Sequence, residues 1–176
     1  MKKTIYLTAV ISSVLFVIFF MVYENAGIGS MLTLAITSGT TAYHFLMRLF
    51  VGFLFDTFMK NKADHSKKWY QCSKWEEDLY KRMKVKHWKN KLPSFKPEYF
   101  DTRKHSLDET AQAMCQAEIV HETIIVLSFV PIIFSVWFGA LPVFVITSVF
   151  SAAVDLIFVI IQRYNRPRII KLIGRK

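Results

Sequence analysis

A group of polar side chains at the end of the last apolar run carries the residue types needed to hold an anion. Arginine guanidinium groups are planar forks of donors that match carboxylate and phosphate, and amide groups add further donors. The sequence therefore predicts a site for anion binding or oxyanion stabilisation where the apolar run ends. This arginine cluster comprises Gln162, Arg163, Asn165, Arg166 and Arg168.

An acid and a base precede the neighbouring apolar run. Glu118 and His121 are three residues apart, so they share one face of a helix. A carboxylate beside an imidazole fixes its tautomer and raises its basicity, as a general base requires. The alternative interpretation is an interfacial polar collar. Because His121 and Arg163 lie at similar distances on either side of a turn at 139–140, the pair should face the arginine cluster across a helical hairpin.

Asp155 is an outlier inside the last apolar run, where it shares a helix face with Gln162 and Arg166. A carboxylate in a membrane helix is costly, so a functional role or a buried partner is expected. His44 and Arg48, four residues apart in another apolar run, are candidate partners. Two alternatives stay open: Asp155 is a protonated packing residue, and Arg48 snorkels to the membrane surface.

The elements that must position these residues are four long apolar runs. Each is close to the roughly 20 residues that an α-helix needs to cross a bilayer. The first run follows two lysines and lacks a small-x-small cleavage site, so we interpret it as a retained helix. The predicted fold is an all-α integral membrane protein with four transmembrane helices, arranged as two hairpins. The runs are Ile5–Val22, Met31–Phe55, Ile119–Phe138 and Leu141–Ile161.

The net charge of +10 is unevenly distributed along the 176 residues and predicts a topology. Basic residues concentrate at the N-terminus, between the hairpins and at the C-terminus, whereas the connections within each hairpin have none. The positive-inside rule then places both termini and the central insert in the cytoplasm of a multi-pass cell-membrane protein. A basic face beside anionic lipid explains the charge better than nucleic-acid binding. The predicted segments are hairpin one (1–55), a basic insert (56–117), hairpin two (118–162) and a basic tail (163–176).

The insert contains two helix signals. An amphipathic helix in the membrane interface is predicted by residues that recur near helical spacing, with Trp88 extending the anchor. These residues are Trp69, Cys72, Trp75 or Glu76, Leu79 and Met83. A second helix should begin at a capping box formed by Ser106 and Glu109.

The two cysteines, Cys72 and Cys115, lack metal-ligand spacing, and a disulfide is not expected in the cytoplasm. We predict neither a metal site nor a bound cofactor.

Four stretches together resemble the glycosyl-4,4′-diaponeurosporenoate acyltransferase family. They are His87-Trp88-Lys89 with Leu92-Pro93, Phe100-Asp101-Thr102-Arg103-Lys104-His105, Ala117-Glu118-Ile119-Val120-His121, and Gln162-Arg163-Tyr164-Asn165-Arg166-Pro167-Arg168. The resemblance covers about half of the chain and implies transfer of a fatty acyl group to a sugar hydroxyl of a glycosylated lipid at the cytoplasmic leaflet. It adds Trp88, Lys89, Arg103 and His105 to the candidate substrate-binding residues.

The predicted site suits this reaction. His121, oriented by Glu118, would act as general base, and the arginine cluster would stabilise the oxyanion or hold the phosphates of a donor such as acyl-CoA. No activated nucleophile is evident, which favours direct attack by the acceptor. Four helices are few to enclose a lipid substrate, so a homodimer or a lateral opening to the bilayer is expected. Glu122, Asp155 and Gln116 depart from the family pattern and leave the acceptor lipid open.

Two other functions stay open at this point. Small membrane methyltransferases and reductases also place Arg, Asn and Glu at a cytoplasmic helix end, where they bind an adenosyl or nicotinamide cofactor. A non-enzymatic lipid-binding protein would explain the apolar hairpins and the basic insert, but not Glu118, His121 and Asp155 within one hairpin.

Overall fold

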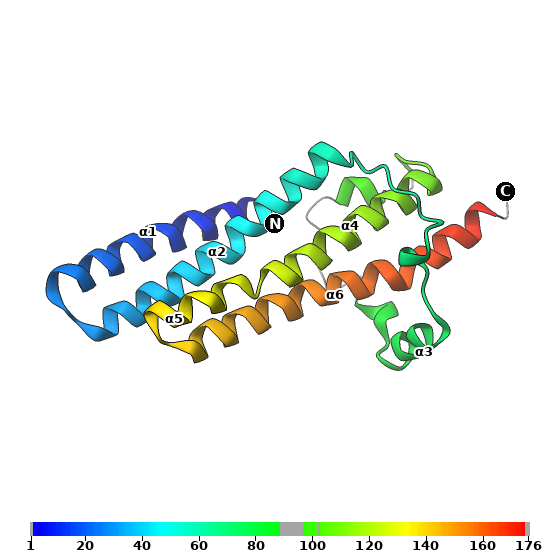
Figure 1. Ribbon diagram of the computed structural model, residues 1–176. Coiled ribbons are helices and arrows are strands. Elements are labelled where there is room, and N and C mark those ends of the chain that lie inside the picture. Colours follow the sequence, from blue (N-terminus) through cyan, green and yellow to red (C-terminus); the bar gives the residue numbers. More distant parts are fainter. Residues whose placement is uncertain (1, 89–96, 102, 175–176) are drawn as a thin grey trace. The chain divides into compact units, whose positions relative to one another are not determined.

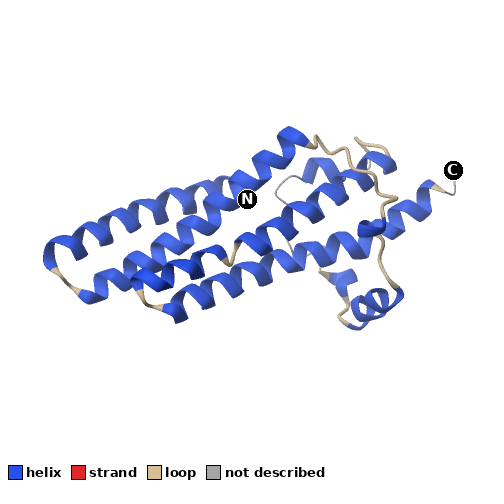
Figure 2. Ribbon diagram, in the orientation of Figure 1, coloured by secondary structure: helices blue, strands red, loops and turns tan. Residues whose placement is uncertain are grey.

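The chain is helical throughout the part that the structure describes (Figures 1 and 2). The structure is a computed structural model, and it describes residues 2–88, 97–101 and 103–174. The α-helices are α1 (Lys2–Ala26), α2 (Gly29–Phe58), α3 (Lys74–Arg82), α4 (Leu107–Leu127), α5 (Ser135–Phe138) and α6 (Leu141–Ile173). Short 3-10 turns occupy Lys68–Tyr70, Val85–His87, Pro97–Phe100 and Val130–Phe134.

Three helical segments of the described residues are long and apolar enough to cross a membrane: Lys3–Ala26, Leu107–Phe138 and Leu141–Ile173. They indicate an integral membrane protein, and the all-helical fold is confirmed for the described residues. The predicted run Met31–Phe55 does form a helix, α2, but α2 is not among these three segments. Its many Ser and Thr residues, together with its ionisable side chains, lower its mean hydropathy, so a fourth spanning helix stays a prediction.

The chain divides into two compact units. The first comprises residues 1–51 and 123–154, and the second comprises residues 52–122 and 155–176. The second unit thus contains α3, most of α4 and the C-terminal half of α6, which are the elements that carry the candidate site. The four predicted segments divide the chain differently, and their boundaries stay a prediction.

In the first unit, a tyrosine compensates for a proline. Pro131 has no N–H, so it cannot donate to the carbonyl of Leu127, four residues earlier. The hydroxyl of Tyr43 donates to that carbonyl instead, at 2.9 Å. The α-helix α4 ends at Leu127, and a 3-10 turn follows at Val130–Phe134. A side chain of α2 therefore satisfies the backbone where the helix changes type.

Arg48 is also held inside the first unit. Its guanidinium donates to the hydroxyl of Ser151 at 2.8 Å and to the Ser151 carbonyl at 3.2 Å. The Ser151 hydroxyl is in turn 2.9 Å from that of Ser128. This network joins α2, the turn that follows α4, and α6 through polar side chains. Arg48 therefore has hydrogen-bond partners within the first unit. A partnership of His44 or Arg48 with Asp155 stays a prediction.

Capping boxes start the two helices of the second unit. Ser106 accepts from the Glu109 N–H at 3.1 Å and its own N–H donates to the Glu109 carboxylate at 2.8 Å, as predicted. Ser73 and Glu76 form the same motif at the start of α3. This second box makes the amphipathic helix begin at Lys74, so the prediction of one helix from Trp69 is wrong: Trp69 lies in the preceding 3-10 turn.

The close approach of α1 and α2 at Gly39 gives a first prediction. A Cβ atom at Gly39 would lie 2.8 Å from Cδ2 of Phe16, whereas a Cβ at Gly52 would have nothing within 4 Å. Gly39→Ala should therefore destabilise the protein by about 1–3 kcal/mol through overpacking. Gly52→Ala, the matched control on the same helix, should be neutral or stabilising by up to about 1 kcal/mol. Thermal denaturation in detergent measures both, and equal melting temperatures would contradict this packing.

Candidate active site

The base of the predicted site pairs with a different carboxylate from the one expected. His121 Nδ1 on α4 lies 2.8 Å from Asp155 Oδ1 on α6. The imidazole also stacks on Phe158, with ring centroids 4.8 Å apart and planes inclined by 13°. Asp155 is buried and the His121 side chain is 24% exposed. Asp155, rather than Glu118, therefore orients the imidazole.

Glu118 is fully occupied by two members of the arginine cluster. Its Oε1 accepts from Arg163 Nη1 at 2.7 Å, and its Oε2 accepts from Arg166 Nη1. Both Glu118 and Arg166 are completely buried. Arg163 and Arg166 are three residues apart and so project from one face of α6 toward the same carboxylate. The predicted facing of α4 and the arginine cluster is thus observed, but Glu118 serves the arginines.

The same two arginines hold the backbone that precedes α3. Arg163 donates to the carbonyls of Trp69, at 3.1 Å, and Gln71, at 3.2 Å, while Arg166 donates to the carbonyl of Tyr70. The Arg166 guanidinium also lies over the Tyr70 ring, 5.1 Å from its centroid. Three consecutive carbonyls are therefore fixed to α6. We call the segment Trp69–Gln71 the strap.

A count of donors shows what Arg163 can do. Its guanidinium has five N–H groups. Nε and Nη2 donate to Glu76, at 2.9 and 3.3 Å, while the remaining three groups bond Glu118 and the carbonyls of Trp69 and Gln71. All five donors are used within the protein. This arrangement differs from the predicted anion clamp, because Arg163 here ties the strap and α3 to α4 and α6.

The other members of the arginine cluster make local contacts. The Asn165 amide donates to the carbonyl of Ile161 at 2.8 Å. Arg168 donates to the hydroxyl of Tyr164, and its guanidinium lies 3.9 Å from the centroid of that ring. Gln162 is half-buried, while Arg168 is exposed. Arg168 is thus the arginine of this cluster whose side chain faces solvent.

Those residues added by the family resemblance that the structure describes make contacts other than with the His121–Asp155 pair. Trp88 packs against the hydrophobic cluster of the second unit, which consists of Tyr80, Val85 and Ile161. Arg103 bonds Asp101 at 3.1 Å. His105 lies 3.8 Å from Glu109, at the start of α4. Lys89, Leu92 and Pro93 lie outside the described residues. A substrate-binding role for these residues stays a prediction.

Two contacts of the site were missed at the sequence level. Glu76 appeared there only as part of an amphipathic pattern, although the Ser73-x-x-Glu76 spacing is a capping-box signal. Glu122, the residue after His121, accepts from the indole N–H of Trp69 at 3.0 Å. No sequence signal indicates this bond, because 53 residues separate its partners.

Ionisation of the side chains around the strap follows their contacts. Burial opposes the charged form of Glu76, but hydrogen bonds from Ser73 and Arg163 outweigh it and lower the pKa to about 2. Burial raises the pKa of the Cys72 thiol to about 11, so this cysteine is no thiolate nucleophile at neutral pH. Among the residues that the structure describes, no group of three or more His, Cys, Asp or Glu side chains could hold a metal ion.

The comparison with known families identifies the chain. The glycosyl-4,4′-diaponeurosporenoate acyltransferase family matches residues 66–175, more than half of the sequence. The chain belongs to this family. The matched region includes the strap, α3, α4 and α6, and therefore the His121–Asp155 pair and the contacts of Glu118. No curated protein and no solved structure matches the chain. Membership in an acyltransferase family supports a transferase and favours acyl transfer over a methyltransferase or reductase.

The buried charges around Glu118 give a second prediction. Glu118→Gln would leave the guanidinium of Arg166 buried without its counter-charge, which should cost about 3–5 kcal/mol of stability. Glu122→Gln is a matched control, since a glutamine oxygen can still accept from Trp69, and it should cost less than about 1 kcal/mol. Thermal denaturation in detergent measures both, and similar losses in the two variants would contradict the special status of Glu118.

The pKa of Glu76 gives a third prediction. Because folding lowers this pKa from 4.5 to about 2, the stability that ionised Glu76 adds is complete above about pH 4.5 and is lost as the pH falls toward 2. The protection of the strap and α3 amides from hydrogen exchange, expressed relative to the intrinsic exchange rate at each pH, should therefore fall across that range. Glu76→Gln should exchange faster at neutral pH and respond less to acid, whereas Glu77→Gln should behave as the unmodified chain does. An unchanged acid response in Glu76→Gln would exclude this linkage.

Proposed function

We propose that the protein is a membrane-embedded acyltransferase that moves a fatty acyl group to a hydroxyl of a glycosylated isoprenoid or other lipid at the cytoplasmic leaflet. Family membership supports the reaction class. The observation that carries the mechanism is the His121–Asp155 pair, at 2.8 Å. In this pair, a partly exposed imidazole contacts a buried carboxylate. The two residues lie on α4 and α6, which belong to segments apolar enough to cross a membrane.

The pair fixes the proton on one side of the imidazole. A carboxylate only accepts hydrogen bonds, so the Asp155 contact keeps the proton of neutral His121 on Nδ1 and leaves Nε2 as the basic nitrogen. The stack on Phe158 holds the plane of the ring. An imidazole held in one tautomer and one orientation by a buried carboxylate is the arrangement that hydroxyl activation requires.

The proposed reaction is a direct transfer. Nε2 of His121 takes the proton of the acceptor hydroxyl. At the same time, the hydroxyl oxygen of the acceptor attacks the carbonyl carbon of an acyl thioester. The tetrahedral intermediate then collapses, the carbon–sulfur bond breaks, and the thiolate receives the proton from His121. The products are an ester and a free thiol. The raised pKa of Cys72 supports this route over an acyl-enzyme on that cysteine.

The donor is proposed to be acyl-CoA or a similar thioester, which binds as a co-substrate. Because Arg163 uses all five donors internally, we assign the phosphate contacts to the exposed Arg168, with Gln162 beside the membrane surface. Glu118, Arg163 and Arg166 then act as positioning residues. They hold the strap, whose Trp69 reaches Glu122 next to His121.

The proposed topology places α2 as a fourth spanning helix and both termini in the cytoplasm of a multi-pass cell-membrane protein. The charge distribution supports this topology, because basic residues follow α2 and α6 but are absent from the Gly27–Ile28 and Gly139–Ala140 turns. A homodimer is proposed as a way to enclose the lipid substrate.

The fourth prediction tests the base. With radiolabelled fatty acyl-CoA and a glycosylated isoprenoid lipid in nanodiscs, His121→Ala should lower the transfer rate by about 10²–10⁴-fold. Asp155→Ala should also lower it, because the imidazole then loses the hydrogen-bond acceptor that fixes its tautomer. Glu122→Gln is the neighbouring control and should keep most of the activity. Melting temperatures equal to that of the unmodified chain would exclude misfolding of the variants. Full turnover by a folded His121→Ala protein would overturn the proposed mechanism.

A further inference from the structure

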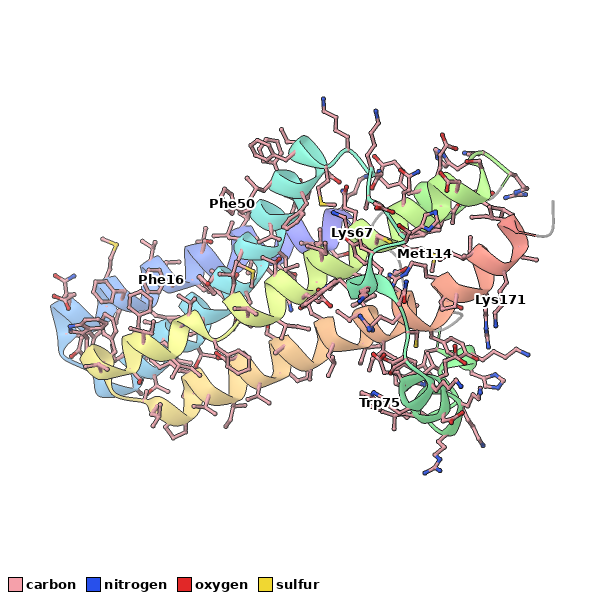
Figure 3. All side chains as sticks on the ribbon, turned by 45° about the vertical axis from the view of Figure 1, so that its right-hand side comes forward. Phe16, Phe50, Lys67, Trp75, Met114 and Lys171 are labelled. Carbon is pink, nitrogen blue, oxygen red and sulfur yellow. The ribbon has the colours of Figure 1, made fainter. Side chains whose placement is uncertain are left out.

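The short helix α3 has an outer face that no described part of the second unit covers. Trp75, Leu79 and Met83 follow one another at intervals of four residues, so they lie along one side of the helix and its C-terminal cap. Their exposed fractions are 69%, 42% and 39%. Trp75 is labelled on this helix in Figure 3. We call these three residues the outer patch. Large apolar side chains grouped in this way mark a contact surface rather than scattered exposure.

The opposite face of α3 is fixed to α6. Glu76 binds Arg163, and Tyr80 is buried against Val85 and Ile161. The Tyr80 ring also meets the Tyr164 ring edge-on, with centroids 6.5 Å apart. The outer patch therefore cannot turn inward without breaking these contacts, so its exposure is a fixed property of the second unit.

The charges around the outer patch indicate its partner. The segment 67–86 carries seven Lys or Arg residues against three acids, and one of those acids, Glu76, is already bound to Arg163. Exposed Lys74, Asp78 and Lys81 lie on a third side of α3, away from the outer patch, and exposed Arg82 and Lys84 flank Met83 in the sequence. Tryptophan with leucine and methionine, bordered by lysine and arginine, suits the boundary between acyl chains and anionic headgroups.

We propose that α3 docks its outer patch into the surface of an anionic lipid leaflet. Lysine and arginine side chains around α3 would contact lipid phosphates, while Trp75, Leu79 and Met83 enter the headgroup boundary. Since Glu76 and Tyr80 fasten α3 to α6, this docking also fixes the depth of the α6 segment that carries Arg163 and Tyr164. The inference concerns lipid binding and does not rest on the proposed acyl transfer.

Tryptophan fluorescence tests the docking. A chain with Trp75 as its single tryptophan carries Trp69→Phe, Trp88→Phe and Trp137→Phe, and is reconstituted in vesicles containing brominated phosphatidylglycerol. Its matched control adds Trp75→Phe and Lys81→Trp, which moves the indole to the side of α3 away from the patch. We expect a blue-shifted emission and severalfold stronger quenching for Trp75 than for the tryptophan at position 81. Equal quenching at the two positions would overturn the proposal.

Lipid charge provides the second comparison. In vesicles of phosphatidylcholine alone, brominated to the same extent, quenching of Trp75 should fall severalfold. Equal quenching in neutral and anionic vesicles would exclude the electrostatic part of the docking. A blue shift of Trp75 emission caused by an added acidic protein, with no quenching by brominated lipid, would assign the patch to a protein partner. That result would overturn the proposal.

A measurement on the unmodified chain keeps the test independent of the substitutions. Lys81 and Arg82 are exposed, so trypsin can reach the bonds that follow them. Cleavage there should be severalfold slower in vesicles with phosphatidylglycerol than in vesicles with phosphatidylcholine only. Equal cleavage rates in the two lipids would contradict docking even if the single-tryptophan variants fail to fold.

Discussion

The second unit of the protein depends on one buried carboxylate. Glu118 has no exposed surface, and both of its oxygens accept from arginines of α6. Two buried ions are costly to remove from water, and their attraction repays this cost only when geometry and further hydrogen bonds are good. Here the further bonds run from the arginines to the strap carbonyls, to Glu76 and to the Tyr70 ring. The buried charge thus fixes the register of α4, α6 and the strap together.

This arrangement explains why Arg163, near the end of a membrane helix, has no free donor to offer an anion. A guanidinium offers five donors, and Arg163 uses every one within the protein. A guanidinium group can hold a loop in place because its donors are fixed in one plane and can bond several acceptors at once. Arg168, five residues later, is exposed and lies over Tyr164. Two arginines of one cluster therefore differ in role: Arg163 is bonded to the strap, whereas Arg168 is exposed.

Some of this could be predicted from the sequence and some could not. Hydrophobic runs predicted the long helices, and the spacing of Ser106 and Glu109 predicted the start of α4, because both signals are local. Helix arithmetic also predicted that α4 faces the arginine cluster. It could not tell which carboxylate meets which base, since Glu118 and Asp155 compete for the same partners. Nor could it predict the bonds between the strap and the arginines of α6, because these contacts span more than 90 residues of sequence.

The three carboxylates near the site consequently have separate roles that follow from their surroundings. Glu118 meets two guanidinium groups, Asp155 meets an imidazole, and Glu122 meets the indole of Trp69. Asp155 touches His121 directly, whereas Glu118 bonds the arginines that hold the strap. One carboxylate therefore stabilises the buried guanidinium groups while another orients the imidazole. This division follows from burial and from the partners that each side chain meets, because all three side chains carry the same functional group.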